Sequence, residues 1–280
     1  MSHTPKILVF DSGLGGLTVF AEVARVRPDA HLIYAADDAG FPYGELGEED
    51  LVARVLSVLQ RLIARVAPDA VVIACNTAST LVLPHLRARF PQLPFIGTVP
   101  AIKPAASQSQ SKLISVLATP GTVARDYTRD LVRTYAAHCE VTLVGSSALA
   151  SLAEAFMQGE SPSDAAILGE IAPAFVANGE GRTDCIVLAC THYPLLIEQL
   201  ERLAPWPVQW IDPAPAIARR TDHVLCEDLG FLPPKTKLHL AAPHHALFTG
   251  ASAPALKLSE ALRLRGIGKI ETEPMPLVFA

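Results

Sequence analysis

The sequence predicts an α/β fold of two similar parallel-sheet lobes, and two observations support this prediction. Apolar runs of strand length alternate with helical stretches along the 280 residues, as in βαβ units. One sequence motif also occurs twice: residues 69–77 (DAVVIACNT) and 184–192 (DCIVLACTH) match in residue type position by position. Such an apolar run between polar residues is typical of a strand buried on both faces. We therefore expect lobes related by a pseudo-two-fold axis, with the active site between them.

The elements follow in order. In the first lobe the pattern predicts strands at 6–10, 31–35 and 70–74, a helix after the glycine turn at 11–16, and a helix at 51–66. Proline-rich residues 91–104 indicate a crossing between lobes. The second series has strands at 112–118, 139–144 and 185–189, with helices at 122–137, 148–157 and 165–177. After prolines near 213 we expect a helix to about 225, then strands near 237–241 and 247–249. The predicted lobes are 1–98 with 209–280, and 99–208.

Composition excludes several classes of protein. Half of the residues are hydrophobic and 18% are charged, as in a compact folded chain. A net charge of −5 gives no electrostatic footprint for nucleic acid. No apolar run approaches the ~20 residues of a membrane span, and the start leads directly into a strand without a signal peptide, so we expect a cytoplasmic protein. The odd count of five cysteines, without an export signal, favours reduced thiols. No Cys-x-x-Cys or His-Glu-x-x-His motif is present, so a zinc site has little support, although a metal at Cys190, His192 and a distant ligand stays open.

Cys75 and Cys190 end the two repeated strands. Open α/β sheets bind ligands at this edge, and a helix that begins just beyond it can lower the pKa of a thiol. A lowered pKa makes the thiol a usable base, and two such thiols suggest proton removal from one face of a carbon and return on the other. A Cys–His nucleophile is the alternative for a single cysteine. Cys139, Cys185 and Cys226 lack this context, so we expect them to be small core residues.

Other polar residues follow predicted strands or begin helices. Asp11, Ser12 and the glycines after them fit a small carboxylate site, whereas a dinucleotide loop does not fit, because Thr18 replaces its third glycine. His192 lies two residues beyond Cys190 and could raise its thiolate fraction. Glu154 lies in an apolar helical stretch, where most glutamates are simply solvated. Further candidates for binding a carboxylate or lining a pocket are Pro42, Tyr43, Gly44, Thr119 and Thr122.

Five motifs, in this order, resemble those of the glutamate racemase family of cofactor-independent aspartate/glutamate racemases. They are FDSGLGGLT (10–18), FPYG (41–44), ACNTA (74–78), TPGT (119–122) and ACTHYPLL (189–196). The match runs from the first strand to Asp212, with departures at 37–40, where the family commonly has an arginine, and at 145–151. The start is too short for the activator-binding segment of some members, so that regulation is not expected.

The resemblance implies glutamate racemisation for peptidoglycan synthesis, without cofactor, often in a homodimer. It implies that Cys75 and Cys190 are the acid/base thiols, and that Asp11, His192 and Glu154 assist them. It further implies that a set of small polar residues holds the ammonium and carboxylates of glutamate. These are Ser12, Pro42, Tyr43, Gly44, Asn76, Thr77, Thr119, Thr122 and Thr191.

Three alternatives remain open. Spacing does not reveal pocket depth, so an aspartate or hydantoin racemase competes with a glutamate racemase. Two lobes around a cleft also describe a non-catalytic small-ligand receptor, for which two matched thiols have no purpose. An inhibitory contact with DNA gyrase, a trait of some family members, has no sequence signal for or against it. Decarboxylases of the superfamily keep one cysteine, so the presence of two opposes that activity.

Overall fold

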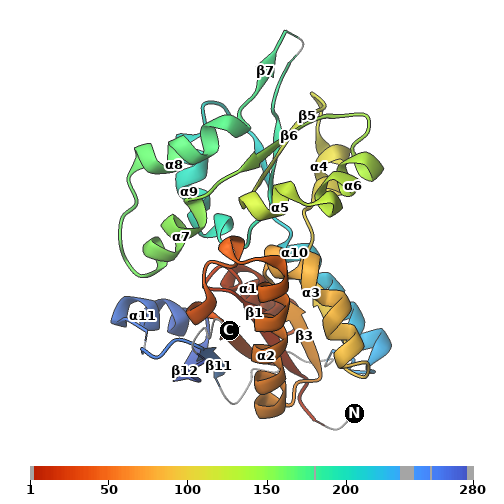
Figure 1. Cartoon of the computed structure of the whole chain (residues 1–280), viewed down its shortest axis with the longest axis vertical. Coiled ribbons are helices and arrows are strands. Elements are labelled where there is room, and N and C mark those ends of the chain that lie inside the picture. Colours follow the sequence, from red (N-terminus) through yellow and green to blue (C-terminus); the bar gives the residue numbers. More distant parts are fainter. Residues whose placement is uncertain (1–2, 180, 234–242, 253, 276–280) are drawn as a thin grey trace. The chain divides into compact units, whose positions relative to one another are not determined.

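The structure is a computed structural model that describes residues 3–179, 181–233, 243–252 and 254–275. The chain divides into two units, one with residues up to Thr98 and from Ala214 onward, the other with Val99–Pro213. The red-to-orange start and the blue end of the chain thus share one unit, and the yellow-to-cyan middle forms the other (Figure 1).

The first unit contains these elements: β1 (Lys6–Asp11), α1 (Leu17–Val26), β2 (His31–Ala36), the short turns η1 (Asp38–Gly40) and η2 (Tyr43–Glu45), α2 (Glu48–Val66), β3 (Ala70–Ile73), α3 (Asn76–Arg89), β4 (Phe95–Gly97), α10 (Ala214–His223), the π-helical turn η5 (Val224–Asp228), β11 (His244–Phe248), α11 (Leu256–Leu264) and β12 (Ile267–Thr272). The second unit contains these: α4 (Ile102–Gln108), β5 (Leu113–Ala118), α5 (Pro120–Ala124), α6 (Asp126–Tyr135), β6 (Glu140–Gly145), α7 (Leu149–Met157), α8 (Asp164–Ile171), η3 (Ala172–Ala174), β7 (Ala177–Asn178), β8 (Gly181–Arg182), β9 (Cys185–Leu188), η4 (Tyr193–Leu196), α9 (Ile197–Leu203) and β10 (Gln209–Ile211).

The two main sheets share one strand order. The first sheet runs β12-β11-β2-β1-β3-β4 and the second runs β10-β9-β5-β6, and all the pairings within them are parallel. The order β2-β1-β3-β4 therefore recurs as β6-β5-β9-β10, with the repeated strands β3 and β9 in equivalent places. The prediction of an α/β protein with two similar parallel-sheet lobes is confirmed.

The aspartate that begins each repeat has a structural role. Asp69 accepts a hydrogen bond from the Lys6 backbone N–H at 2.8 Å, at the start of β1. Asp184 accepts from the backbone N–H groups of Gln110 and Ser111 at 2.6 and 2.8 Å, just before β5. In each unit this carboxylate thus ties the entry of the first strand to the strand that bears the cysteine.

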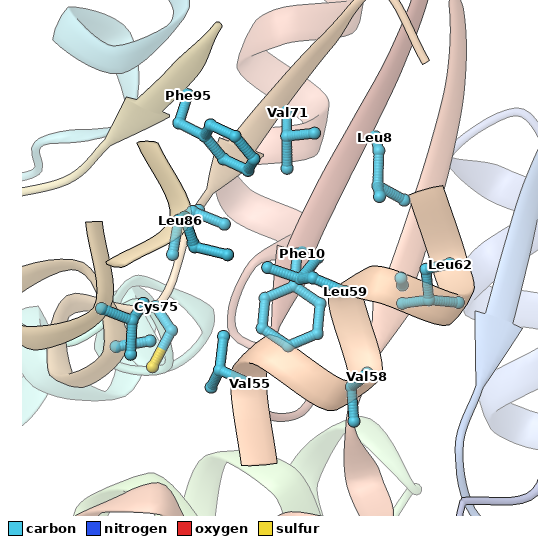
Figure 2. Packing of buried hydrophobic residues seen from close by; sticks show 14 of the residues in the cluster. Leu8, Phe10, Val55, Val58, Leu59, Leu62, Val71, Cys75, Leu86 and Phe95 are labelled. Atoms are coloured by element: carbon cyan, nitrogen blue, oxygen red, sulfur yellow. The ribbon is translucent and has the colours of Figure 1, made fainter. Parts of the chain in front are cut away.

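The core of the first unit forms where α2 covers one face of the sheet. Val55, Leu59 and Leu62 recur at helical spacing on α2 and are fully buried. They pack in one cluster with Leu8 and Phe10 of β1 (Figure 2). This packing fixes the carboxyl edge of β1 and β3, where the polar candidates lie.

Several boundaries differ from the predictions. The expected helix at 122–137 is split at Arg125, whose backbone is extended, and the helix expected to reach 177 ends at 171, just before Pro173. The proline-rich segment 91–104 contains β4 and the start of α4. The second unit extends to Pro213, beyond the expected boundary at 208, because β10 pairs with β9. The strand expected at 237–241 lies outside the described residues, and the strand expected near 247–249 overlaps the end of β11.

Candidate active site

Cys75 lies at the carboxyl edge of the first sheet, immediately before α3. Its side chain is 5% exposed, at the border of the buried cluster that contains Val55 and Leu86 (Figure 2). The Sγ atom lies 3.7 Å from the hydroxyl oxygen of Ser12, which follows the neighbouring strand β1. Because α3 has 14 residues, its N-terminal N–H groups and dipole favour a negative charge on this thiol.

Asn76 and Thr77 form the first turn of α3 and are buried beside Cys75. Neither the amide nitrogen nor the amide oxygen of Asn76 has a hydrogen-bond partner among the described residues. An unpaired buried amide is costly, so such a group is usually completed by a ligand or by water. Asn76 is therefore the strongest candidate for a substrate contact in this unit.

Asp11 is fully buried where β1 ends. Its Oδ2 accepts from the Gly16 backbone N–H at 2.9 Å, which closes the glycine turn before α1. A Cβ atom at position 16 would lie 2.7 Å from the Asp11 Cβ, so the close approach needs glycine. The carboxylate is thus held rigidly beside Ser12, at the same edge as Cys75.

Tyr43, between Pro42 and Gly44, begins the short turn η2 and is 2% exposed. Its hydroxyl donates to Asp37 Oδ2 at 2.6 Å, and its ring centroid lies 6.5 Å from that of Phe10. Burial raises the pKa of Tyr43 well above its usual value, and the charges of Asp37 and Cys75 raise it further. The phenol of Tyr43 is therefore neutral, and its hydroxyl proton is used in the hydrogen bond to Asp37. A ligand at this turn would bind to its backbone groups.

Cys190 lies at the carboxyl edge of the second sheet, just beyond β9, with a different set of partners. Its Sγ lies 3.7 Å from Nδ1 of His192, and Nε2 of His192 lies 2.7 Å from Oε1 of Glu154. Glu154 projects from α7, so the structure brings together three residues from two separate segments. His192 and Cys190 are both buried.

The charge state of His192 follows from these contacts. Burial lowers the pKa of His192, but hydrogen bonds to Cys190 and Glu154 and their negative charges outweigh it, so the pKa is raised well above the ordinary value. The ring is thus an imidazolium at neutral pH, with Glu154 as its counter-ion. An imidazolium beside a thiol stabilises the thiolate, as in Cys–His enzymes.

Three predicted threonines belong to the second unit. The hydroxyl oxygens of Thr119 and Thr122 lie 3.0 Å apart at the end of β5, and Thr122 is fully buried. Thr191 is buried between Cys190 and His192 in the chain. These hydroxyls lie at the carboxyl edge of β5 and β9, which pair in the sheet.

The remaining cysteines differ from this pair. All five cysteines are free thiols. Burial and then Asp184 raise the pKa of Cys185, inside β9, to about 12, and burial also raises the pKa values of Cys139 and Cys226. These three thiols are protonated at neutral pH and are unsuited to act as bases.

The sequence did not predict a role for Asp37, Arg54 and Thr249. Asp37 binds the Tyr43 hydroxyl and is itself bound by Arg54 and Thr249. A signal for Asp37 was present, because it lies two residues after the predicted strand 31–35, close to the strand end at which Asp11 follows 6–10. No local signal marks Arg54 or Thr249, since their role depends on contacts between distant segments.

Two further observations concern metals and membranes. Among the described residues, no group of three or more His, Cys, Asp or Glu side chains is arranged to hold a metal ion. No described helix combines the length and the apolar character that crossing a bilayer requires.

This chain is similar in sequence to a known protein family and to individual members of it. The Asp/Glu/Hydantoin racemase family matches residues 17–221. A glutamate racemase of Brucella ovis is 58% identical over 219 residues, which are 78% of this chain and 79% of the relative, and one of Agrobacterium fabrum is 56% identical over 78% of this chain and 80% of the relative.

Solved structures of glutamate racemases are also similar to the structure of this chain. The structure of Escherichia coli glutamate racemase in complex with L-glutamate and the activator UDP-MurNAc-ala has a TM-score of 0.87 at 39% identity, covering 97% of this chain and 99% of the other. The glutamate racemase isoform RacE1 of Bacillus anthracis has a TM-score of 0.77 at 25% identity, covering 98% and 99%. With a family match over most of its length and relatives above half identity, this chain belongs to the Asp/Glu/Hydantoin racemase family, among the glutamate racemases.

Proposed function

We propose that this protein interconverts L- and D-glutamate with two cysteines and no cofactor. One observation carries the proposal: each unit bears a buried cysteine at the same position of a repeated strand, and each thiol has its own polar partner. The names of the relatives supply the substrate, and the Escherichia coli relative is a glutamate racemase in complex with L-glutamate.

In the forward direction the Cys190 thiolate removes the α-proton of L-glutamate. The C–H electron pair stays on the α-carbon, and the Cys75 thiol then donates its proton to the opposite face, which gives D-glutamate. Cys75 is left as thiolate and Cys190 as thiol, and the reverse reaction starts from that state. This mechanism requires both thiols to reach the same α-carbon.

The α-proton is a very weak acid, so the site must stabilise charge as it forms. Asn76 supports this role because its buried amide lacks a partner among the described residues. Asp11 assists at the Cys75 side, and His192 with Glu154 assists at the Cys190 side. The residues that hold the ammonium and carboxylates are Ser12, Pro42, Tyr43, Gly44, Thr77, Thr119, Thr122 and Thr191.

The proposal also covers the location, the assembly and the biological role of the enzyme. We assign the enzyme to the cytoplasm as a homodimer that supplies D-glutamate for peptidoglycan. Its support is the likeness to glutamate racemases.

The test is circular dichroism of L-glutamate incubated with the reduced protein and no added cofactor. We expect the signal to decay to zero, and Cys75→Ala or Cys190→Ala to slow this decay by about 10³-fold or more. Cys139→Ala is the matched control and should retain activity, because Cys139 is distant in sequence from both repeated strands. Full activity in either single variant would refute the two-thiol mechanism.

L-Aspartate in the same assay separates the nearest alternative. Faster turnover of aspartate than of glutamate would make the protein an aspartate racemase. Glutamate binding without any loss of optical activity would point to a receptor.

A further inference from the structure

Asp37 carries a buried carboxylate that accepts hydrogen bonds from side chains of three other segments. It follows β2 and is 0% exposed. Its Oδ2 accepts from the Tyr43 hydroxyl at 2.6 Å and from Arg54 Nε at 2.9 Å. Its Oδ1 accepts from Arg54 Nη2 and from the Thr249 hydroxyl, both at 2.5 Å. We call Asp37, Tyr43, Arg54 and Thr249 the Asp37 cluster.

Arg54 connects this cluster to the late part of the chain. It projects from α2, its side chain is 10% exposed, and its Nη2 also donates to the Met275 carbonyl at 2.6 Å. The backbone N–H of Met275 in turn donates to the Thr249 carbonyl at 2.9 Å. A bidentate pair of this kind is geometrically specific, so it fixes the Asp37 carboxylate in one orientation.

Tyr43 connects Asp37 to the residues around Cys75. Tyr43 and Cys75 belong to the same buried cluster, and the turn η2 packs against α3, which begins one residue after Cys75. The hydroxyl of Tyr43 binds Asp37, so the Asp37 cluster determines where the Pro42-Tyr43-Gly44 turn lies relative to α3.

We propose that Asp37, Arg54 and Thr249 are positioning residues that hold the Tyr43 turn against Cys75. This inference rests on the proposed function, since it assigns to Tyr43 a place beside the thiol that protonates the substrate. Arg54 and Thr249 do not touch the substrate. They act through the Asp37 carboxylate and the Tyr43 hydroxyl, and the β11–β12 segment thereby contributes to the first half of the site.

The first test uses the chemical reactivity of Cys75 and does not depend on catalysis. Iodoacetamide alkylation of Cys75 and Cys190 would be followed by peptide mass spectrometry in wild type, Thr249→Val, Tyr43→Phe and Arg54→Met. Loss of one buried hydrogen bond should open the turn more often and speed Cys75 alkylation about fivefold. Cys190 belongs to the other unit and serves as the internal reference.

Arg61→Met is the matched control. Arg61 lies seven residues after Arg54 on α2 and pairs with Glu273 at 3.0 Å, but its side chain is 55% exposed. We expect wild-type alkylation of Cys75 in this variant. Unchanged Cys75 reactivity in Thr249→Val and Tyr43→Phe would overturn the proposal, and so would an equal rise at Cys190.

The second test is a double-mutant cycle on kcat/KM for glutamate. If Arg54 acts through Tyr43, adding Arg54→Met to Tyr43→Phe should cost little more than the larger single effect, and Arg54→Lys should restore part of the activity. Additive losses would overturn the route through Tyr43. A wild-type protein inactive on glutamate refutes the proposed function, whereas the alkylation result decides the positioning role by itself.

Discussion

Cys75 and Cys190 occupy equivalent positions in the repeat but have different neighbours. Cys75 faces the hydroxyl of Ser12 and the first turn of α3, whereas Cys190 faces the His192–Glu154 pair. A hydroxyl can donate to either protonation state, but an imidazolium favours the thiolate. The two cysteines are therefore equivalent in the repeat of strands but not in the chemistry of their neighbours.

Glu154→Gln tests the charge on His192. The Glu154 carboxylate helps to raise the pKa of His192, so the variant should lose the imidazolium at a lower pH than wild type. We expect kcat/KM to fall about tenfold to a hundredfold at pH 8 and its alkaline limb to move to lower pH. A pH profile of kcat/KM checks this, with exposed Glu160→Gln as control. An unshifted alkaline limb would remove Glu154 from this role.

Asn76→Ala separates function from stability. The variant should lose about 10²-fold in kcat if the amide binds the developing charge. It should unfold at the same urea concentration as wild type or at a higher one, because a buried amide without a partner among the described residues is removed. A large loss of stability would show instead that Asn76 has a structural role.

At the scale of elements, the sequence predicted the strands that are buried on two faces, and also the more exposed edge strand β6. It did not predict β4, β10 or β12, which are short or lie at sheet edges. In β12 only Ile267 is buried, so its pattern has no clear alternation, and β4 has three residues within a proline-rich segment. Motif residues could be placed at strand ends, but Glu154 reaches His192 only through the packing of α7.

Asp184→Ala tests the role of the repeated aspartate. Loss of its bonds to Ser109, Gln110 and Ser111 should lower the free energy of unfolding by about 2 kcal/mol at pH 7. Burial alone would raise the pKa of Asp184, but these bonds outweigh it and the pKa is lowered. The stabilisation is therefore present above pH ~4 and is lost as pH falls through the folded pKa, so variant and wild type should converge in acid.

Urea denaturation from pH 3 to pH 7 measures this difference. Asp164→Ala is the control, because Asp164 pairs with Arg202 on the surface of the same unit and should contribute little. Equal stability of wild type and Asp184→Ala at pH 7 would leave the aspartate without a structural role.

At the scale of the molecule, the first unit is assembled from the two ends of the described chain. β11 lies between β2 and β12, and its first residue, His244, accepts the Leu32 backbone N–H at Nδ1 over 3.2 Å. Burial, then the nearby His31, lowers the pKa of His244 to about 4. The neutral imidazole of His244 thus forms one of the hydrogen bonds that join β11, late in the chain, to β2, early in the chain.

This predicts a pH-dependent stability. The unfolded chain binds a proton at His244 below about pH 6.5 and the folded one only below about 4, so stability is complete above pH 6.5 and falls by up to about 3 kcal/mol towards pH 4. His244→Asn keeps an acceptor near Nδ1 but cannot titrate, so its urea midpoint should vary less over this range. Exposed His85→Asn in the same unit should follow wild type. Parallel curves for His244→Asn and wild type would contradict the prediction.

The discontinuous first unit also sets an order of events during synthesis. Every strand of the second sheet has left the ribosome once Ile211 has emerged, whereas β2 then still lacks its neighbour β11. Arg54 must wait a further 60 or so residues for its partner, the Met275 carbonyl. The unit with Cys190 can therefore mature while translation continues, and the environment of Cys75 is completed only after Met275 has been synthesised.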